Sequence, residues 1–332
     1  MGNCARSEGE NRVSTQIDGF KKIHPIGKGA FGKVWKVVNE TTGQVFAMKE
    51  MSKSLVYSKK LVASVMNERK FLGVLRHPFL VNLHYGFQDK ENLYLVVDMM
   101  PGGDLRYHYM VNPMISEDSI RFMTACIVAG LEYLSVNNII HRDLKPENLV
   151  FDNNGYLHLT DFGIARSTTM DNTNTTSGTH GYMSPEAICT QNQSTVSDYF
   201  ALGVILFEVT NGSRPYLGSN KKEIRDSILE KQVKMPAKNR WSKELNHFIN
   251  RLIQRKPQKR LGFNGIQEIK SHPWLKDFDW EKLLSKSLKS PIKISPGKNF
   301  DENQVSEIFS PIKAIKEALD PKIFSGYSYS SF

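Results

Sequence analysis

The sequence predicts an α+β protein with two lobes: a small antiparallel β-sheet with one main helix, followed by a larger, mostly helical lobe. Alternating apolar and polar residues over positions 20–51 indicate half-buried strands. After residue 101, apolar residues recur at steps of three and four, which indicates helices. The chain of 332 residues is also longer than one small core requires.

Three stretches predict the small lobe. Residues 20–51 contain FKKIHPIGKGAFGKVWKVVN and QVFAMKEM, which alternate as strands do, and ETTG between them supplies a hairpin turn. Residues 58–77, SKKLVASVMNERKFLGVLRH, predict a helix with Leu61, Val65, Glu68 and Leu72 on neighbouring faces. Residues 92–100, NLYLVVDMM, predict a strand that leads into the connection between the lobes.

Two long apolar helices are predicted for the large lobe. Ser116 is a suitable N-cap for a buried helix over residues 116–136. Its apolar residues follow the helical period: Ile120, Met123, Ile127, Leu131 and Leu134. The stretch SDYFALGVILFEVTNG, residues 197–212, predicts a second helix that is apolar along most of its length.

Composition narrows the class of protein. With 40% hydrophobic residues and no long apolar run, we expect a soluble, intracellular protein without a transmembrane helix or secretory signal. Its three cysteines, Cys4, Cys126 and Cys189, are widely spaced, so we expect reduced thiols. The net charge is +10 and the pI about 9.3, but Lys and Arg are scattered and no nucleic-acid partner is predicted. The basic surface favours weak attraction to anionic membranes.

Residues 139–163, IIHRDLKPENLVFDNNGYLHLTDFG, hold the most unusual polar pattern in the chain. Asp143, Lys145, Asn148 and Asp161 lie between short apolar runs. Charged groups close to a core are costly unless they are paired or hold an ion, so a plain solvated loop fits the pattern poorly. Carboxylate and amide oxygens are suitable ligands for Mg²⁺. The stretch therefore predicts a functional site.

The pattern H-R-D-L-K-x-x-N followed by D-F-G resembles the catalytic loop and metal-binding turn of protein kinases. The resemblance implies ATP and Mg²⁺ as cofactors, with Asn148 and Asp161 as metal ligands. It implies that Asp143 is the base that orients the attacking hydroxyl, and that Lys145 neutralises charge on the phosphate during transfer. Lys145 at this position resembles the Ser/Thr-specific kinases more than the tyrosine-specific ones.

Gly27, Gly29 and Gly32 form a G-x-G-x-x-G pattern, which also occurs in dinucleotide-binding Rossmann units. A Rossmann unit needs a helix directly after the glycines, whereas this sequence predicts a strand. The pattern, with Lys49 in AMK, instead resembles the kinase loop that covers the ATP phosphates. The resemblance makes Lys49 the phosphate-holding lysine and Glu68 its ion-pair partner.

The resemblance also implies a nucleotide pocket. Val97 resembles the gatekeeper residue, the backbone of Asp98 and Met100 is expected to bond adenine, and Ala47 and Val150 are expected to enclose the base. The residues expected at the nucleotide are Gly27, Lys28, Gly29, Ala30, Phe31, Gly32, Val34, Ala47, Lys49, Val97, Asp98, Met100, Asp104, Glu147, Val150, Asp161 and Phe300.

Residues 164–186, IARSTTMDNTNTTSGTHGYMSPE, are poor in apolar side chains, and we expect them to be mobile until something anchors them. The resemblance implies phosphorylation of Thr175, with Thr176 as the alternative. Arg142 and Arg166 would bind the phosphate bidentately and order the segment. Thr179 is expected to bond Asp143 and Lys145.

Four further residues of the large lobe are assigned by the resemblance. Ser184 stands where the usual A-P-E motif has alanine, a change between small residues that we expect to be tolerated. Glu186 is expected to pair with Arg260. Asp198 is expected to hold the backbone of the catalytic loop.

The last sixty residues resemble the tail of the AGC group of kinases, which wraps both lobes. The tether-like PIKISP (291–296) is followed by Phe300, expected near the nucleotide, and by FSGYSY (324–329). Phe324 and Tyr327 are expected to fill a groove beside the Glu68 helix. Ser328 matches the phosphosite of the hydrophobic motif, and Ser310 is a weaker turn-motif candidate. The predicted divisions are a flexible segment (1–19), a kinase domain (20–274, with lobes at 20–98 and 101–274) and a tail (275–332).

Within the AGC group, HPFLVNLHYGFQDKENLYLVVDMMPGGDLRYHY resembles the YANK-type kinases, which also begin with an acylation signal on Gly2. Gly2 and Cys4 resemble neighbouring myristoylation and palmitoylation sites, and two acyl chains would anchor the protein stably to a membrane. Arg6 stands where Ser or Thr is favoured, so a plain flexible tail is the alternative. We expect a cytoplasmic protein, with membrane association if it is acylated.

Two functional classes follow from the resemblance. The first is an active, non-specific serine/threonine protein kinase, acting as a monomer and controlled by an upstream kinase or by autophosphorylation. Asp104, Glu147 and Glu208 would receive substrate arginines, which implies protein substrates with a basic residue two or three places before the Ser or Thr. The alternative is a nucleotide-binding pseudokinase or scaffold; loss of Lys49, Asp143 or Asp161 would favour it, and all three are present.

Overall fold

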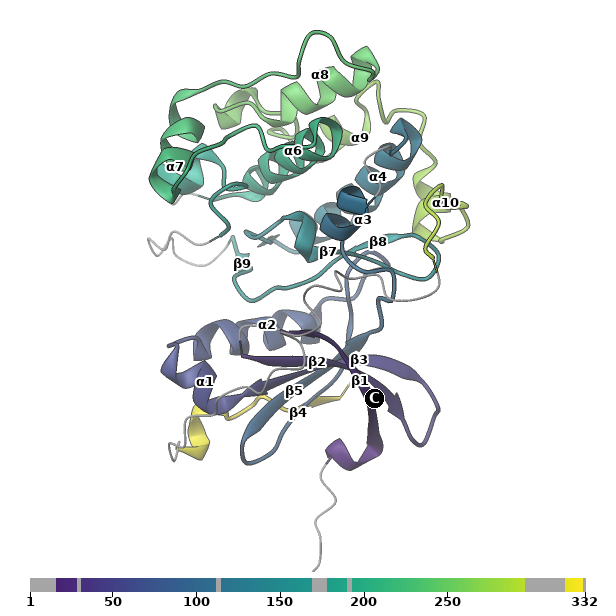
Figure 1. Ribbon diagram of the computed structural model, residues 1–332, viewed down its shortest axis with the longest axis vertical. Helices are drawn as coiled ribbons and strands as arrows, with labels where there is room; N and C mark the ends of the chain where they lie inside the picture. Colours follow the sequence, from purple (N-terminus) through teal and green to yellow (C-terminus); the bar gives the residue numbers. More distant parts are fainter. Residues whose placement is uncertain are drawn as a thin grey trace, which may run out of the picture.

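The computed structural model describes residues 16–28, 31–111, 115–168, 178–189, 193–295 and 320–330. Figure 1 shows two lobes, a small one built on a β-sheet and a larger one that is mostly helical, joined by the chain that follows strand β5. This arrangement confirms the predicted α+β, two-lobed fold class.

The small lobe is organised around one antiparallel sheet with strand order β1-β2-β3-β5-β4-β10. The strands are β1 (Phe20–Lys28), β2 (Gly32–Asn39), β3 (Val45–Ser52), β4 (Leu83–Gln88), β5 (Asn92–Asp98) and β10 (Tyr329–Ser330). Lys49 of β3 lies in register between Val34 of β2 and Leu95 of β5. A side chain on Gly32 would come within 1.6 Å of the carbonyl oxygen of Glu50, so the close approach of β2 to β3 requires glycine there.

The helix predicted over residues 58–77 begins later than predicted, and a separate short helix that was not predicted precedes it. Helix α1 (Lys53–Ser58) starts after Ser52, whose hydroxyl accepts from the N–H of Leu55. Lys60 adopts a left-handed conformation with φ of 57°, which interrupts the helix, so α2 spans Val62–Val74. Leu61 therefore lies outside the buried face, whereas the other residues expected on it, Val65, Glu68 and Leu72, are buried.

The large lobe packs its helices around α4 and α6. The elements of this lobe are α3 (Leu105–Val111), α4 (Glu117–Val136), β6 (Ile139–Ile140), β7 (Leu149–Phe151), β8 (Leu157–Leu159), β9 (Arg166–Ser167), α5 (Pro185–Cys189), α6 (Thr195–Asn211), α7 (Lys221–Glu230), α8 (Lys243–Leu252), α9 (Gln267–Lys270) and α10 (Trp280–Leu284). Ser116 caps α4 as predicted, because its hydroxyl accepts from the N–H of Ser119 at 3.1 Å.

Helix α4 is long and apolar enough to cross a membrane, so the expectation that the chain has no such candidate was wrong by length and composition. It is the one candidate among the described residues, and 72% of its apolar window is buried inside the protein. Its apolar character is explained by the core of the large lobe, which it crosses between β8 and α6.

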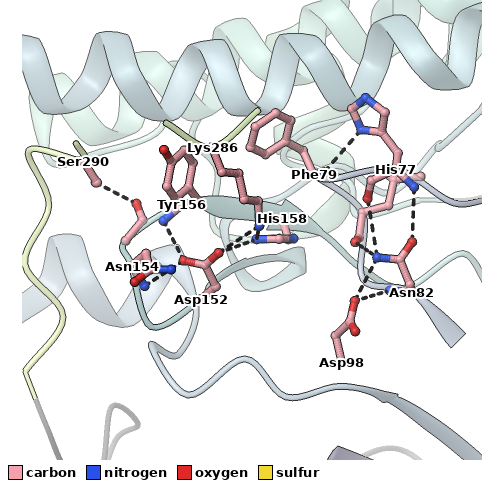
Figure 2. A network of polar contacts seen from close by, with 12 residues as sticks. His77, Phe79, Asn82, Asp98, Asp152, Asn154, Tyr156, His158, Lys286 and Ser290 are labelled. Atoms are coloured by element: carbon pink, nitrogen blue, oxygen red, sulfur yellow. Dashed lines mark hydrogen bonds and ion pairs between the residues drawn. The ribbon is translucent and has the colours of Figure 1, made fainter. Parts of the chain in front are cut away.

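The chain after α10 is fastened to the turn between β7 and β8. Lys286 contacts Asp152 at 3.0 Å and His158 at 3.2 Å, as Figure 2 shows, and Ser290 donates to the carbonyl of Gly155 at 2.9 Å. Tyr156 donates a further hydrogen bond to the carbonyl of Leu288. These bonds hold the segment after α10 against β7, β8 and the turn that joins them.

The end of the chain returns to the small lobe. Phe324 and Tyr327 are buried there beside α2, as predicted for the tail. Arg69 of α2 donates to the carbonyl of Tyr327 at 2.8 Å, and Lys53 lies over the ring of Phe324. The sequence did not predict that the tail also forms strand β10, which pairs with Tyr85 and Gly86 of β4.

Arg260 is the largest of the fully buried side chains in the described part of the chain, and its guanidinium forms the predicted pair with Glu186. The two terminal nitrogens of Arg260 donate to the two carboxylate oxygens of Glu186 at 2.6 and 2.9 Å. Further bonds join Arg260 to the carbonyls of Val196 and Gln254. Although burial opposes it, the bonding to Arg260 holds the pKa of Glu186 below its usual value.

Arg260→Met should therefore be strongly destabilising, because it leaves the carboxylate of Glu186 in the protein without its cation. We expect the free energy of unfolding at pH 7 to fall by about 3 kcal/mol or more. Denaturant titration measures this difference. Lys259→Met, which changes an exposed neighbour, is the control and should change stability by less than about 0.5 kcal/mol.

Candidate active site

The loop that carries Asp143, Lys145 and Asn148 is held in place by one buried carboxylate. Asp198 of α6 accepts hydrogen bonds from the backbone N–H groups of His141 and Arg142 at 2.8 and 3.0 Å. Burial raises the pKa of Asp198, which these bonds and the nearby cationic groups oppose. Arg142 has a φ of 70°, so the carboxylate holds a backbone turn that a side chain disfavours. The predicted role of Asp198 is confirmed.

Asp143 follows this turn and is bound on several sides. One carboxylate oxygen accepts from the ammonium of Lys145 at 2.6 Å and from the amide of Asn148 at 3.1 Å. The other accepts from the hydroxyl of Thr179 at 2.7 Å and from its backbone N–H at 3.1 Å. Lys145 also reaches the hydroxyl of Thr179 at 3.2 Å. The structure thus brings together the four residues that the sequence assigned to this point.

Lys49 and Glu68 form the expected pair between β3 and α2. The ammonium of Lys49 lies 2.8 Å from both carboxylate oxygens of Glu68. Burial lowers the pKa of Lys49, but the charges of Glu68 and Asp161 outweigh it and hold the ammonium charged. Burial raises the pKa of Glu68, and Lys49 opposes that rise. The ammonium of Lys49 is therefore fixed by Glu68, close enough to Asp161 for the charge of that carboxylate to stabilise it.

Helix α2 is also joined directly to the turn that carries Asp161. Ser64 donates to the carbonyl of Gly163 at 2.9 Å, and Asn67 donates to the carbonyl of Ala165 at 2.8 Å. These contacts were not predicted, because in the sequence Ser64 and Asn67 are indistinguishable from ordinary polar residues of an amphipathic helix. Because of them, the position of Glu68 depends on the position of the Asp161 turn.

The two predicted metal ligands flank the same strand pair. Asn148 uses its amide nitrogen on Asp143, which leaves its amide oxygen for a cation. Asp161 has a φ of 65°, a left-handed conformation that residues other than glycine rarely adopt, and its carboxylate accepts from the N–H of Gly163 at 3.3 Å. No group of three or more His, Cys, Asp or Glu suited to a metal occurs in the described ranges. One carboxylate and one amide oxygen fit Mg²⁺, which keeps waters and phosphate oxygens in its shell.

The expected nucleotide residues of the small lobe line β1, β2, β3 and β5. Gly27 and Lys28 pair with Val34 and Lys33 at the end of the first hairpin, and Ala47 lies opposite Val97. Gly29 and Ala30 lie outside the described residues. Phe31 is partly buried against the core, and its carbonyl accepts from Ser52.

The connection between lobes is set by Asp98. Its carboxylate accepts from the backbone and side-chain N–H groups of Asn82 at 2.9 and 2.8 Å, drawn in Figure 2, and lies 2.7 Å from His84. Burial would raise the pKa of Asp98, but these hydrogen bonds outweigh burial and lower the pKa. The backbone N–H of Asp98 donates to the carbonyl of Asn82 at 3.1 Å, so it is occupied within the chain. Only its carbonyl is left for the adenine contact expected of it.

Two of the three carboxylates expected to receive substrate arginines bind an arginine of this chain. Arg106 of α3 contacts Glu147 at 2.9 Å and Glu208 at 2.7 Å. Asp104 lies at the start of the same helix, where it accepts from the N–H of Tyr107, and its pKa is raised by burial and by Glu147. Sequence reasoning missed Arg106; the only signal was a basic residue two places after Asp104 in GGDLR.

Other predicted residues are placed only in part. Val150 lies in β7 and bridges to Asp104. Burial and the charge of Arg166 lower the pKa of Arg142, so the two cations are close, as a phosphate site requires. Ser328 is exposed, and its carbonyl accepts from Arg69. The other predicted modification and tail positions lie outside the described residues: Gly2, Cys4, Thr175, Thr176, Phe300 and Ser310.

Comparisons with known proteins agree with this geometry. The protein kinase domain model matches residues 20–275, so the chain belongs to the protein kinase family. It is 39% identical over 280 residues to a probable serine/threonine-protein kinase of Dictyostelium discoideum, covering 84% of this chain and 61% of that protein. It is 38% identical to the serine/threonine-protein kinase sgk-1 of Caenorhabditis elegans, covering 94% of this chain and 68% of the relative.

The relatives define the branch of the family more narrowly. A RAC family serine/threonine-protein kinase homolog of Dictyostelium discoideum is 34% identical, covering 93% of this chain and 71% of that protein. The chain is an AGC-group member of the serine/threonine kinases. It spans about three fifths of the first of these relatives. The finer resemblance to YANK-type kinases stays a prediction.

Lys49→Met tests the buried pair. The change removes the cation that limits the effect of burial on the pKa of Glu68. That pKa should therefore rise further above its value in the unfolded chain. The folded variant then binds more protons than the unfolded chain, and its free energy of unfolding should fall as pH rises from 5 to 8. We expect a loss of about 3 kcal/mol at pH 8 and less at pH 5.

Denaturant titrations at both pH values measure this loss. Lys49→Met/Glu68→Leu is the matched control, because it removes the carboxyl as well, and it should lose most of the additional pH dependence. If the free energy of unfolding of Lys49→Met depended on pH as that of the wild type does, Lys49 would not hold the charge of Glu68.

Proposed function

We propose that the chain is a catalytically active serine/threonine protein kinase of the non-specific class, which uses ATP and Mg²⁺. The observation that carries the proposal is the bonding around Asp143. Its carboxylate is oriented by Lys145, Asn148 and Thr179, and in the small lobe Lys49 is paired with Glu68. Positioning and charge neutralisation are what phosphoryl transfer requires.

Each residue has a defined task in this reaction. The substrate hydroxyl oxygen bonds to the γ-phosphorus as the bond from phosphorus to the bridging oxygen breaks, ADP leaves, and Asp143 accepts the hydroxyl proton. Mg²⁺ held by Asn148 and Asp161 would supply positive charge to the phosphate oxygens. Lys49 holds phosphate oxygens of the nucleotide, and Lys145 places a second cation beside the hydroxyl that attacks.

A nucleotide-binding pseudokinase or scaffold is the alternative function. Such a protein would tolerate loss of the base, the phosphate lysine or the metal ligand. In this chain Lys49 is paired and Asp143 is oriented, while Asp161 stands in the D-F-G sequence. These features favour catalysis over a purely structural role.

Regulation is proposed to act through two segments. Phosphate on Thr175 or Thr176, added by an upstream kinase or by autophosphorylation, would offset the repulsion between the neighbouring cations of Arg142 and Arg166. Phosphorylation of Ser328 would add charge next to Arg69, which already binds the tail backbone. Ser310 is a further candidate site.

We further propose a monomeric, cytoplasmic enzyme that binds protein substrates and no nucleic acid. The carboxylates of Asp104, Glu147 and Glu208 favour basic residues before the target Ser or Thr. Acylation of Gly2 and Cys4 would add contact with membranes, aided by the basic charge of the chain.

Acylation is tested by metabolic labelling of the full chain with a myristate analogue, followed by membrane flotation. The wild type should be labelled and float, and Gly2→Ala should lose both properties because the acylated amine requires glycine. Cys4→Ser should keep the label but float less, since one acyl chain binds membranes only reversibly. A wild type that is not labelled would contradict acylation and favour the alternative, a flexible segment without a lipid.

Asp143→Asn tests the catalytic role. The amide keeps the shape of the side chain but cannot accept the hydroxyl proton, so we expect kcat for Ser and Thr peptides to fall by about 10²–10⁴-fold. ATP binding, measured by a fluorescent nucleotide, should change little. Asp277→Asn alters an exposed carboxylate and should keep wild-type kcat. ATP binding without transfer by the wild type, even when Thr175 and Ser328 are phosphorylated, would favour the scaffold.

A further inference from the structure

Arg106 binds the acidic cluster of Glu147 and Glu208, where a substrate arginine would be expected. Its Nε contacts Glu147 at 2.9 Å, one terminal nitrogen contacts Glu208 at 2.7 Å, and the other donates to the hydroxyl of Tyr182 at 2.5 Å. The guanidinium also lies 5.2 Å from the centre of the Tyr109 ring. All three nitrogens of the guanidinium are therefore used within the chain.

Little of the bonding capacity of this acidic cluster is left for a second arginine. Glu208 is only 5% exposed, and its other oxygen accepts from the hydroxyl of Tyr182 at 2.5 Å. Burial and the bond to Glu208 raise the pKa of Tyr182, so this hydroxyl stays a neutral donor. Asp104 gives one oxygen to the N–H of Tyr107. Glu147, whose side chain is 44% exposed, is the member that an incoming cation reaches most easily.

Arg106 is held in place by the chain that carries it. It follows Leu105, which is buried at the start of α3, so the first turn of the helix is fixed. A bonded side chain on a fixed backbone has a high effective concentration, which a separate peptide must overcome. A substrate arginine would also have to break three contacts of Arg106 in order to form equivalent ones, so the exchange brings little net gain.

We propose that Arg106 is a specificity-determining residue that occupies the subsite of Glu147 and Glu208 from within the chain. The wild type then selects only weakly for arginine shortly before the target Ser or Thr, and accepts uncharged residues there. The inference rests on the kinase activity proposed above and changes its expected substrate selection, because a weak preference for basic residues replaces a strong one.

Arg106→Met tests the inference, since methionine keeps an unbranched apolar stem and removes the cation. Two peptides that differ only by Arg or Met two places before the Ser are compared by kcat/KM. The wild type should prefer the Arg peptide by less than about threefold, and Arg106→Met by about tenfold or more. Arg225→Met, which changes an exposed arginine of α7, should keep the wild-type ratio.

Binding gives a second readout that does not depend on phosphate transfer. The same peptides with Ala in place of Ser carry a fluorophore, and their affinity is measured by anisotropy at two salt concentrations. Arg106→Met should bind the Arg peptide more tightly than the wild type does, and with a stronger salt dependence. If neither protein phosphorylates either peptide, the proposed activity fails, whereas this binding difference still decides the role of Arg106.

Thermal unfolding checks that the variants are folded. Should Arg106→Met unfold because Glu208 loses its cation, Arg106→Lys replaces it: a lysine can keep one ion pair but not the planar fork, and should give an intermediate ratio. A wild type that already prefers the Arg peptide tenfold, with no increase in either variant, would overturn the inference.

Discussion

The buried carboxylate of Asp198 is the interaction on which the candidate site depends. It fixes the N–H groups of His141 and Arg142 in a backbone turn that would otherwise be strained. The next residue, Asp143, can then reach the hydroxyl of Thr179 from a segment 36 positions further along the chain. Helix α6 supplies the anchor because it is buried along most of its length and cannot shift without disturbing the large-lobe core.

Sequence patterns and the resemblance to kinases predicted most of the fold and the contacts of Asp143 and Lys49. Alternation located the strands β1, β2, β3 and β5, and helical periodicity with Ser116 as cap located α4, because local residue order decides these features. The later start of α2 was missed because it depends on the left-handed backbone conformation of Lys60. Strand β10 was missed because two residues of the tail pair with a strand more than 240 positions earlier.

The least predictable parts of the site are the contacts that use a known residue for a second purpose. Asp98 was assigned through its backbone, yet its side chain fixes Asn82 and His84. Glu147 and Glu208 were assigned to substrates, yet they bind Arg106. Residue types at given spacings indicate what a site can do, but which partner completes a charge depends on side chains that only the folded chain brings together.

The pairing of β10 with β4 also bears on how the protein behaves in concentrated solution. A sheet edge with unpaired N–H and C=O groups is a template for strands of other molecules. In this protein the tail covers part of that edge at Tyr85 and Gly86, and the buried rings of Phe324 and Tyr327 hold it there. A docked tail is thus a safeguard against self-association, and a preparation in which it is detached or clipped would be prone to form aggregates through β4.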